Sequence, residues 1–181
     1  LLCEWDSITA LIAELCEVPA CLIMNCQGDT IEVKATTESP DNPYKHGDSE
    51  KMAGKLYCET VIKEQAPLHV PDALADPEWC DNPDIKLGMI MYYGVPINWP
   101  DDTPFGTLCI LDREKKIVQS LEKRLIHHFA RLIEANLELL VRNDELEHAA
   151  GHDHLTGLFN RRMMHEILSK EIATSRRLDI G

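Results

Sequence analysis

One long stretch of the chain is compatible with only one regular structure. From Ser120 to Ala150 the sequence contains neither glycine nor proline, and charged residues are mixed with leucine, isoleucine and alanine. Glycine and proline are the residues that most disfavour a helix interior, so their absence predicts one uninterrupted α-helix. At a rise of about 1.5 Å per residue, this helix would be roughly 45 Å long. Gly151 is expected to break it.

Leucine recurs at every seventh position of this helix, which is typical of a coiled coil. Two sets of residues form the repeat: Leu125, Leu132, Leu139 and Leu146 at position d, and Phe129, Asn136, Asn143 and Ala150 at position a. Asparagine at position a lowers stability but favours a parallel pair in register, because each buried amide needs the amide of its twin. The repeat therefore predicts a parallel homodimer joined through this helix.

The upstream half of the helix has a wider apolar face, because Ile126, Ile133 and Leu140 occupy position e. A face of this width favours a bundle of more than two helices. We expect the N-terminal helix to join the bundle through Leu11 and Leu15, and a two-helix stalk to take over downstream. The alternative is that the long helix lies on the sheet of its own domain.

The residues before the long helix alternate between helical and strand-like patterns. Apolar residues at helical spacing predict a helix over 6–17, which Pro19 ends. Turn-forming residues at 27–29 and 100–102 separate pairs of apolar runs, so each pair is expected to form an antiparallel hairpin. The full prediction is strands at 21–24, 30–36, 68–70, 89–98 and 105–111, a second helix at 54–64, and irregular segments at 37–53 and 73–88.

The net charge of −13 is unevenly distributed. Residues 151–181 contain five Lys/Arg and four Asp/Glu, a net of +1, so the preceding 150 residues carry about −14. Nucleic acids and anionic membranes both bind cationic surfaces, so neither is expected as a partner. No apolar run approaches the roughly 20 residues of a membrane helix, and the first residues do not resemble a signal peptide. We expect a cytoplasmic protein whose seven cysteines are free thiols, with no metal site.

Residues 153–162 read DHLTGLFNRR. They closely resemble the N-terminal signature of GGDEF domains, the diguanylate cyclases, whose pattern is roughly DxLTGLxNRR. The matching residues are Asp153, Leu155, Thr156, Gly157, Leu158, Asn160, Arg161 and Arg162. In that family the catalytic residues come later in the chain. The resemblance implies that 151–181 is the truncated start of a GGDEF domain, that this fragment has no catalytic residues, and that its parent makes cyclic di-GMP from two GTP with Mg.

Three stretches within residues 1–117 resemble a GAF domain: LYCETVIKEQAPLHVPDALADP at 56–77, GMIMYYGVPI at 88–97 and PFGTLCILD at 104–112. The resemblance implies an α+β fold, with a six-stranded antiparallel sheet flanked by helices. It makes 118–150 both the last helix of the domain and the signalling helix. GAF domains are commonly small-molecule sensors, and some bind cyclic nucleotides, haem or bilins. Others have no ligand and serve as dimerisation spacers.

Together the two resemblances imply the sensory module of a bacterial cyclic di-GMP signalling protein. An unknown small molecule would bind to the GAF domain, and the helix would relay this to the cyclase domain. A ligandless dimerisation spacer is the alternative. No cofactor is required by the sequence of this segment.

The GAF resemblance places a ligand pocket between one face of the sheet and the 54–88 region. The candidate binding residues are Cys58, Thr60, Trp79, Asp84, Met89, Met91, Tyr93 and Cys109. Alternation along the predicted strand puts Met89, Met91 and Tyr93 on one face, where Cys109 of the next strand can face them. The alternative is that these are core side chains, because methionine and aromatic residues in a row on a strand usually pack.

A third possibility is a thiol-based reductase on the GAF fold, with Cys58 and Cys80 as a redox pair and Cys109 as a further participant. A reactive thiol needs a nearby cation or a helix N-terminus to lower its pKa. Glu59, next to Cys58, acts in the opposite direction. The sequence therefore favours a sensor or a spacer over this enzyme.

Overall fold

The computed structural model of the chain describes residues 2–151, together with Met164 and Lys170. The chain separates into two compact units, Leu1–Asn136 and Leu137–Gly181. The first unit contains a six-stranded sheet in which all neighbouring strands are antiparallel. The strands are β1 (Ala20–Gln27), β2 (Thr30–Thr36), β3 (Ser49–Lys51), β4 (Leu68–Val70), β5 (Met91–Asn98) and β6 (Pro104–Asp112). The predicted α+β architecture with six antiparallel strands is confirmed.

The strand order is β3-β2-β1-β6-β5-β4. The first three strands along the chain thus form one half of the sheet, and the last three form the other half. The halves meet only where β1 pairs with β6, with Ala20 opposite Leu111 and Asn25 opposite Gly106. Both predicted hairpins, β1–β2 and β5–β6, are present.

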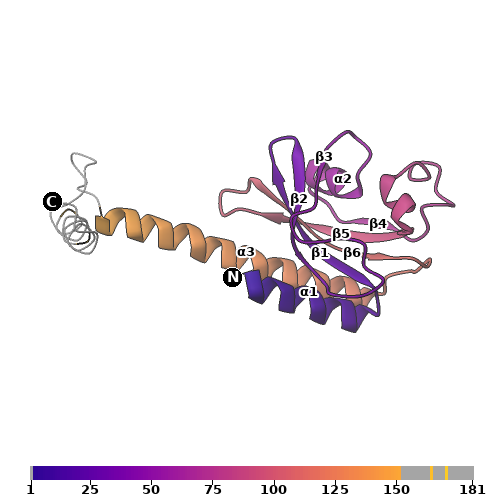
Figure 1. The fold of residues 1–181 in the computed structure, drawn as a ribbon, viewed down its shortest axis with the longest axis horizontal. Helices are drawn as coiled ribbons and strands as arrows, with labels where there is room; N and C mark the ends of the chain where they lie inside the picture. The colour runs from indigo at the N-terminus through magenta and orange to yellow at the C-terminus, as the bar shows by residue number, and fades with distance from the viewer. Residues whose placement is uncertain (1, 152–163, 165–169, 171–181) are drawn as a thin grey trace, which may run out of the picture. The chain divides into compact units, whose positions relative to one another are not determined.

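Helices cover the two faces of the sheet differently (Figure 1). Helix α1 (Leu2–Cys16) and the first turns of α3 (Ser120–Gly151) lie along one face, which we call the helix face. Helix α2 (Tyr57–Glu64) and the 3-10 helix η1 (Pro83–Leu87) lie on the opposite face, which we call the cavity face. The cavity face is therefore covered by short elements and the loops that connect them.

The helix face is a filled apolar core. Ile23 of β1 and Ile110 of β6 are fully buried there. Helix α3 contributes Ile126, Ala130 and Ile133, which are at most 4% exposed and recur at i, i+4 and i+7. This spacing places them on one side of the helix. The alternative interpretation therefore holds for the upstream half of α3, which lies on the sheet of its own domain.

The leucine repeat of α3 is not used in this packing. Leu132, Leu139 and Leu146 are exposed by 49%, 66% and 69%, whereas Leu125 and Phe129 are half-buried. On α1, Leu11 and Leu15 are exposed by 44% and 54%. The leucines of α3 are the residues assigned to the coiled coil, and Leu11 and Leu15 are those assigned to the helix bundle; association of two copies through them stays a prediction.

A lysine joins the end of α1 to the start of α3. The Lys116 ammonium donates a hydrogen bond to the carbonyl of Cys16, the last residue of α1. It also lies 3.2 Å from the carboxylate of Glu122, in the first turn of α3. A cation at the C-terminal end of one helix and an anion at the N-terminal end of another both complement the helix dipoles.

The structure differs from the sequence prediction in several places. The predicted loop 37–53 contains the short edge strand β3, and η1 lies within the predicted irregular segment 73–88. Helix α2 begins at Tyr57 rather than at Gly54, because Gly54 has a positive φ of 84° that a helix does not permit. A β-bulge between Ile23 and Met24 shifts the register with β2, so Val33 lies opposite Met24 but Ala35 lies opposite Ile23.

Candidate ligand cavity

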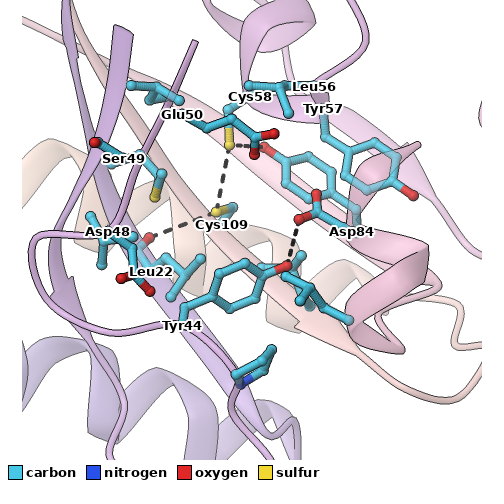
Figure 2. Close-up of a pocket in the computed structure, with 17 residues that line it drawn as sticks. Leu22, Tyr44, Asp48, Ser49, Glu50, Leu56, Tyr57, Cys58, Asp84 and Cys109 are labelled. Atoms are coloured by element: carbon cyan, nitrogen blue, oxygen red, sulfur yellow. Dashed lines mark hydrogen bonds between the residues drawn. The ribbon is translucent and has the colours of Figure 1, made fainter. Parts of the chain in front are cut away.

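A cavity of about 210 Å³ lies between the cavity face and the elements that cover it (Figure 2). Its floor is apolar and comes from the sheet: Leu22 and Met24 of β1, Ile31 and Val33 of β2, and Leu111 of β6. Alternation along each strand directs these side chains to one face. The other walls come from the 43–50 segment, the start of α2 and η1. A concave apolar site with a few polar groups is typical of a small-molecule site.

Tyr44 and Asp84 form the polar contact that crosses the cavity. The Tyr44 hydroxyl donates a hydrogen bond of 2.7 Å to the Asp84 carboxylate (Figure 2). Tyr44 belongs to the long loop after β2, and Asp84 belongs to the first turn of η1. The contact therefore ties two segments that lie 40 residues apart in the chain.

Asn82 holds Asp84 in place. Its side-chain oxygen accepts a hydrogen bond of 2.9 Å from the Asp84 backbone amide, which caps η1. Its amide nitrogen donates to the Lys55 carbonyl at 2.8 Å, just before α2. Asn82 is 4% exposed. It therefore connects η1 to the start of α2 from a buried position.

Burial sets the protonation behaviour of this pair. Burial raises the pKa of Asp84, and the hydrogen bond from Tyr44 lowers it in part. Burial also raises the pKa of Tyr44, and the charge of Asp84 raises it further. Tyr44 is therefore a neutral donor at physiological pH, and Asp84 holds its charge less readily than an exposed aspartate.

The rim of the cavity is acidic. Asp48, Glu50 and Asp84 line it, and none of the described lining residues is a lysine or an arginine. The Asp48 carboxylate accepts a hydrogen bond of 2.8 Å from the Lys45 backbone amide. A site of this charge disfavours phosphate and carboxylate groups and favours cationic or hydrogen-bond-donating groups.

Two cysteine thiols meet on the wall of the cavity. Cys58 lies in the first turn of α2 and Cys109 in the middle of β6, and their sulfur atoms are 4.0 Å apart (Figure 2). The Cys58 sulfur also lies 3.4 Å from the Tyr92 hydroxyl. The Cys109 thiol contacts the Leu22 carbonyl at 3.9 Å.

The hydrogen bond between the thiols acts on them in opposite directions. It lowers the pKa of Cys58, because a donor stabilises the Cys58 thiolate, and the Tyr92 hydroxyl adds to this against the effect of burial. The same hydrogen bond raises the pKa of Cys109, and burial raises it further. Cys58 is therefore the more acidic thiol of the two.

An aromatic stack closes one end of the cavity. The rings of Tyr57 and Tyr92 are stacked with their centroids 4.6 Å apart. Trp79 packs against the other side of Tyr57 at 4.9 Å. The Tyr92 hydroxyl lies over Gly94, where an added Cβ would be 2.1 Å from it. The absence of a side chain at Gly94 thus makes room for the Tyr92 ring.

The structure brings three of the eight predicted binding residues to the cavity wall: Cys58, Asp84 and Cys109. Thr60 is half-buried on α2, Trp79 packs behind Tyr57, and Met89 is part of the buried core on the cavity face. These three side chains are not among the residues that line the cavity.

Met91 and Tyr93 lie on the helix face of the sheet. The prediction that they face Cys109 is therefore wrong. In the observed register Cys109 lies opposite Gly94 and Tyr92 lies opposite Leu111. Tyr92 therefore shares the cavity face with Cys109. Tyr93 instead contacts α3, with its hydroxyl 3.4 Å from the His127 ring and its own ring under the Lys123 ammonium.

Sequence reasoning missed several of the lining residues. They are Tyr44, Asp48, Ser49, Glu50, Leu56, Tyr57 and Tyr92, together with the apolar floor. Tyr57 and Tyr92 stand within the stretches that resembled a GAF domain, so their aromatic character was an available signal. Leu56 also stands in one of these stretches, and the floor residues come from β1, β2 and β6. Tyr44, Asp48, Ser49 and Glu50 come from a polar segment whose course the sequence pattern does not indicate.

Two further sets of predicted residues have different outcomes. The leucine, asparagine and phenylalanine residues assigned to the signalling helix lie on α3, which is one uninterrupted helix as predicted. Gly151, which was expected to break the helix, is itself helical. The signature at 153–162 lies outside the described residues. Within the described part of the chain, no group of three or more His, Cys, Asp or Glu could hold a metal ion. No described helix is both long and apolar enough to span a bilayer.

Comparison with known families gives one match that covers most of the chain. The GAF domain model matches residues 3–137. This range contains the complete sheet, both faces described above and the upstream half of α3.

The chain is also similar to two proteins of cyclic di-GMP metabolism. A cyclic di-GMP phosphodiesterase of Pseudomonas aeruginosa is 29% identical over 116 residues, which cover 62% of this chain and 19% of that protein. The diguanylate cyclase DgcP of Escherichia coli is 30% identical over 131 residues, which cover 67% of this chain and 37% of that protein. The chain thus spans only a part of each relative's length.

Among solved structures, the PixJ GAF-domain of Thermosynechococcus elongatus in its blue-light absorbing form has a similar fold. The TM-score is 0.70 at 16% identity, and the match covers 84% of this chain and 94% of that one. At this identity the likeness concerns the fold alone.

Proposed function

This chain belongs to the GAF domain family, and on that basis we propose that it is a sensory module that binds a small molecule in the cavity between its sheet and α2. The similarity to two cyclic di-GMP enzymes supports a regulatory role in that signalling system. We divide the chain into the sensory domain at 1–117, the signalling helix at 118–150 and the start of an output domain at 151–181.

The observation that carries the proposal is the cavity itself. Partial burial of a carboxylate costs free energy even when one hydrogen bond is kept, and a GAF domain that serves only as a spacer gains nothing in return. Here Asp84 is half-buried at the cavity wall and has Tyr44 as its side-chain donor. A ligand that donates a hydrogen bond or carries a positive charge would add a second partner.

The ligand class follows from volume and charge. A cavity of about 210 Å³ is smaller than the 300–1,000 Å³ typical of sites for drug-sized ligands. The apolar floor and the acidic rim favour a small molecule with an apolar body and an amine or other donor group. A phosphate-bearing ligand would meet Asp48, Glu50 and Asp84 without a lysine or arginine among the described lining residues.

Thermal unfolding of the chain with a panel of small amines, amino acids and cyclic nucleotides tests this proposal. A ligand at 100 times its dissociation constant stabilises the folded state by about 2.7 kcal/mol, which raises the melting temperature of a domain of this size by several degrees. We expect the shift with cationic or neutral donors and not with cyclic nucleotides.

A matched pair of variants locates the binding. Val33→Phe fills the cavity from β2, and Lys34→Phe places the same side chain on the adjacent, partly exposed position. The ligand-induced shift should be lost in Val33→Phe and kept in Lys34→Phe. If no compound stabilises the wild-type chain, or if both variants keep the shift, the ligandless spacer becomes the better description.

The relay is proposed to run through a parallel dimer of α3. The leucines at 132, 139 and 146 recur every seven residues along α3 and are exposed. Two such leucine stripes would bury each other in a parallel coiled coil, which fixes the phase between sensor and output. Leu11 and Leu15 of α1 would extend this interface at the sensor end.

Sedimentation of Leu132→Lys tests the dimer. A buried lysine at this position should convert dimers to monomers, whereas Arg131→Gln changes the charge by one unit in the opposite direction beside the stripe and should leave dimers intact. A wild-type chain that already sediments as a monomer at high micromolar concentration would contradict the relay, but it would leave the ligand cavity untouched.

The output domain is proposed to be a GGDEF diguanylate cyclase, on the strength of the signature at 153–162 and the similarity to DgcP. Such a domain would use GTP and Mg. In the whole protein, a ligand found by thermal unfolding should change the rate of cyclic di-GMP formation, and Val33→Phe should remove that change. An output that forms no cyclic di-GMP from GTP would contradict the assignment of a cyclase.

A further inference from the structure

The two thiols on the cavity wall come from separate elements and meet in a partly accessible space. Cys58 is partly exposed and Cys109 is buried, yet both line the cavity. Their sulfur atoms must approach by about 2 Å to reach the length of a disulfide bond. A rotation of the Cys58 side chain on the first turn of α2 is a local way to close that gap.

We propose that Cys58 and Cys109 form a reversible disulfide when a hydroperoxide enters the cavity, so that the wall of the ligand site is also a thiol oxidation site. This proposal rests on the position of the two thiols and is independent of which small molecule the cavity binds. It also differs from the predicted pairing of Cys58 with Cys80. Cys80 is exposed, and its thiol contacts the Pro77 carbonyl at 3.5 Å.

The environment assigns a different role to each thiol. Cys58 faces the Tyr92 hydroxyl and the Cys109 thiol, and both hydrogen bonds stabilise its thiolate. Cys58 is therefore the nucleophile that attacks the peroxide, since the thiolate is the reactive form. Cys109, whose pKa is raised, stays protonated until Cys58 has been oxidised.

The reaction balances in two steps. With hydrogen peroxide, the Cys58 thiolate attacks one peroxide oxygen and the O–O bond breaks, which gives a sulfenic acid and a hydroxide that takes up one proton to form water; an organic hydroperoxide would release its alcohol instead. The Cys109 sulfur then attacks the sulfenic sulfur, the S–O bond breaks, and the leaving hydroxide takes the Cys109 proton to form a second water. The peroxide accepts two electrons, and the two thiols supply them. A dithiol reductant reverses the bond by thiol–disulfide exchange.

Peptide mapping can detect this disulfide without ambiguity. Cleavage after lysine and arginine places Cys58 alone in the peptide 56–63 and Cys109 alone in the peptide 87–113. Cys80 lies in 64–86, and the other four cysteines lie together in 1–34. After treatment of the folded chain with a small excess of hydrogen peroxide, we expect the linked pair 56–63 with 87–113, the loss of two titratable thiols, and recovery of both with dithiothreitol.

Three variants give the controls. Cys58→Ser and Cys109→Ser should each abolish the linked pair, and Cys80→Ser should leave it unchanged. If either serine variant fails to fold, alkylation of the wild-type chain is measured instead of that variant. The cysteine in peptide 56–63 should then be alkylated well before the cysteine in peptide 87–113. The proposal is overturned if peroxide leaves Cys109 free while Cys58 proceeds to a sulfinic acid. It is also overturned if the folded chain gives the same mixture of disulfides as the chain in urea.

Discussion

Leu22 and Ile23 are neighbours on β1 and are equally apolar, but they lie on opposite faces of the sheet. Ile23 is fully buried on the helix face, under long helices that fill the space above it. Leu22 is 3% exposed, yet it forms part of a cavity floor. The exposure of a residue thus does not separate a packed core from a binding site. The two faces differ because long helices cover the helix face, whereas short elements and loops cover the cavity face.

The largest expected effect comes from truncating these two neighbours. Ile23→Ala leaves a void in a filled core and should lower the free energy of unfolding by about 4 kcal/mol, whereas Leu22→Ala enlarges an existing space and should lower it by about 2 kcal/mol. Urea unfolding of both variants measures the difference. Equal losses would mean that the cavity face is packed as tightly as the helix face.

Substitution of two glycines by alanine extends the comparison from side-chain volume that is removed to side-chain volume that is added. A Cβ on Gly106, on the helix face, would lie 1.9 Å from the Met24 carbonyl oxygen, so the backbone of β1 must move. A Cβ on Gly94, on the cavity face, would meet the hydroxyl end of the Tyr92 side chain, which lines the cavity, so a side chain rather than a backbone must move. We expect Gly106→Ala to cost about 3 kcal/mol and Gly94→Ala about 1 kcal/mol.

The two glycine variants also differ in a chemical readout. Displacement of the Tyr92 ring by Gly94→Ala removes the hydroxyl from its place beside Cys58, so the Cys58 thiol should be alkylated more slowly. Gly106→Ala should leave the alkylation rate unchanged in the folded protein. A larger loss of stability in Gly94→Ala than in Gly106→Ala would contradict the assignment of free space to the cavity face.

A smaller effect is expected from pH on the cavity face. The pKa of Asp84 is raised above its ordinary value of 3.8, chiefly by burial. The folded state therefore binds this proton more readily than the unfolded state, and Asp84 makes the protein more stable as pH falls through its folded pKa toward 3.8. Asp84→Asn should remove this contribution and raise stability near neutral pH. Thermal unfolding at several pH values tests this. As pH falls, the stability of the wild type should rise more steeply than that of Asp84→Asn.

The smallest effect is expected from His69, whose pH response has the opposite sign. Burial lowers its pKa below 6.5, and the Lys123 charge lowers it further. Its ring nitrogen accepts a hydrogen bond from the Val118 amide at 3.3 Å, and its ring packs against Tyr93 of the helix face. Stability should thus fall as pH drops from 6.5 toward the lowered value. His69→Gln keeps an acceptor and should flatten this slope, and a wild-type slope that persists in the variant would point to another group.

The features that the sequence predicted well depend on long or repeated patterns. A run without glycine or proline predicted α3 from end to end, because helix propensity adds over many residues. The hairpins followed from apolar runs that flank short turns. The strand pattern by itself predicted five of the six strands and missed β3, and the six-stranded sheet was implied by the GAF resemblance.

The site was harder to predict because it depends on register and loops. Met91, Tyr92 and Tyr93 are all buried, so this end of strand β5 has no exposed polar residue to mark which face each one takes. A one-residue difference in phase was enough to select Tyr93 in place of Tyr92. Tyr44 reaches Asp84 only because the loop after β2 folds over the sheet, and no local pattern indicates that course.

The order of the strands also affects how the chain folds as it leaves the ribosome. Strand β1 lies between β2 and β6, so one of its two edges pairs with β6. Ala20 cannot pair with Leu111 until that part of the chain has been synthesised. Until then β1 is an unpaired edge with an apolar sequence, which is open to pairing with other chains. Contacts this distant in sequence also close slowly. We therefore expect nascent chains that stop before β6 to aggregate, and expression to depend on chaperones that protect this strand.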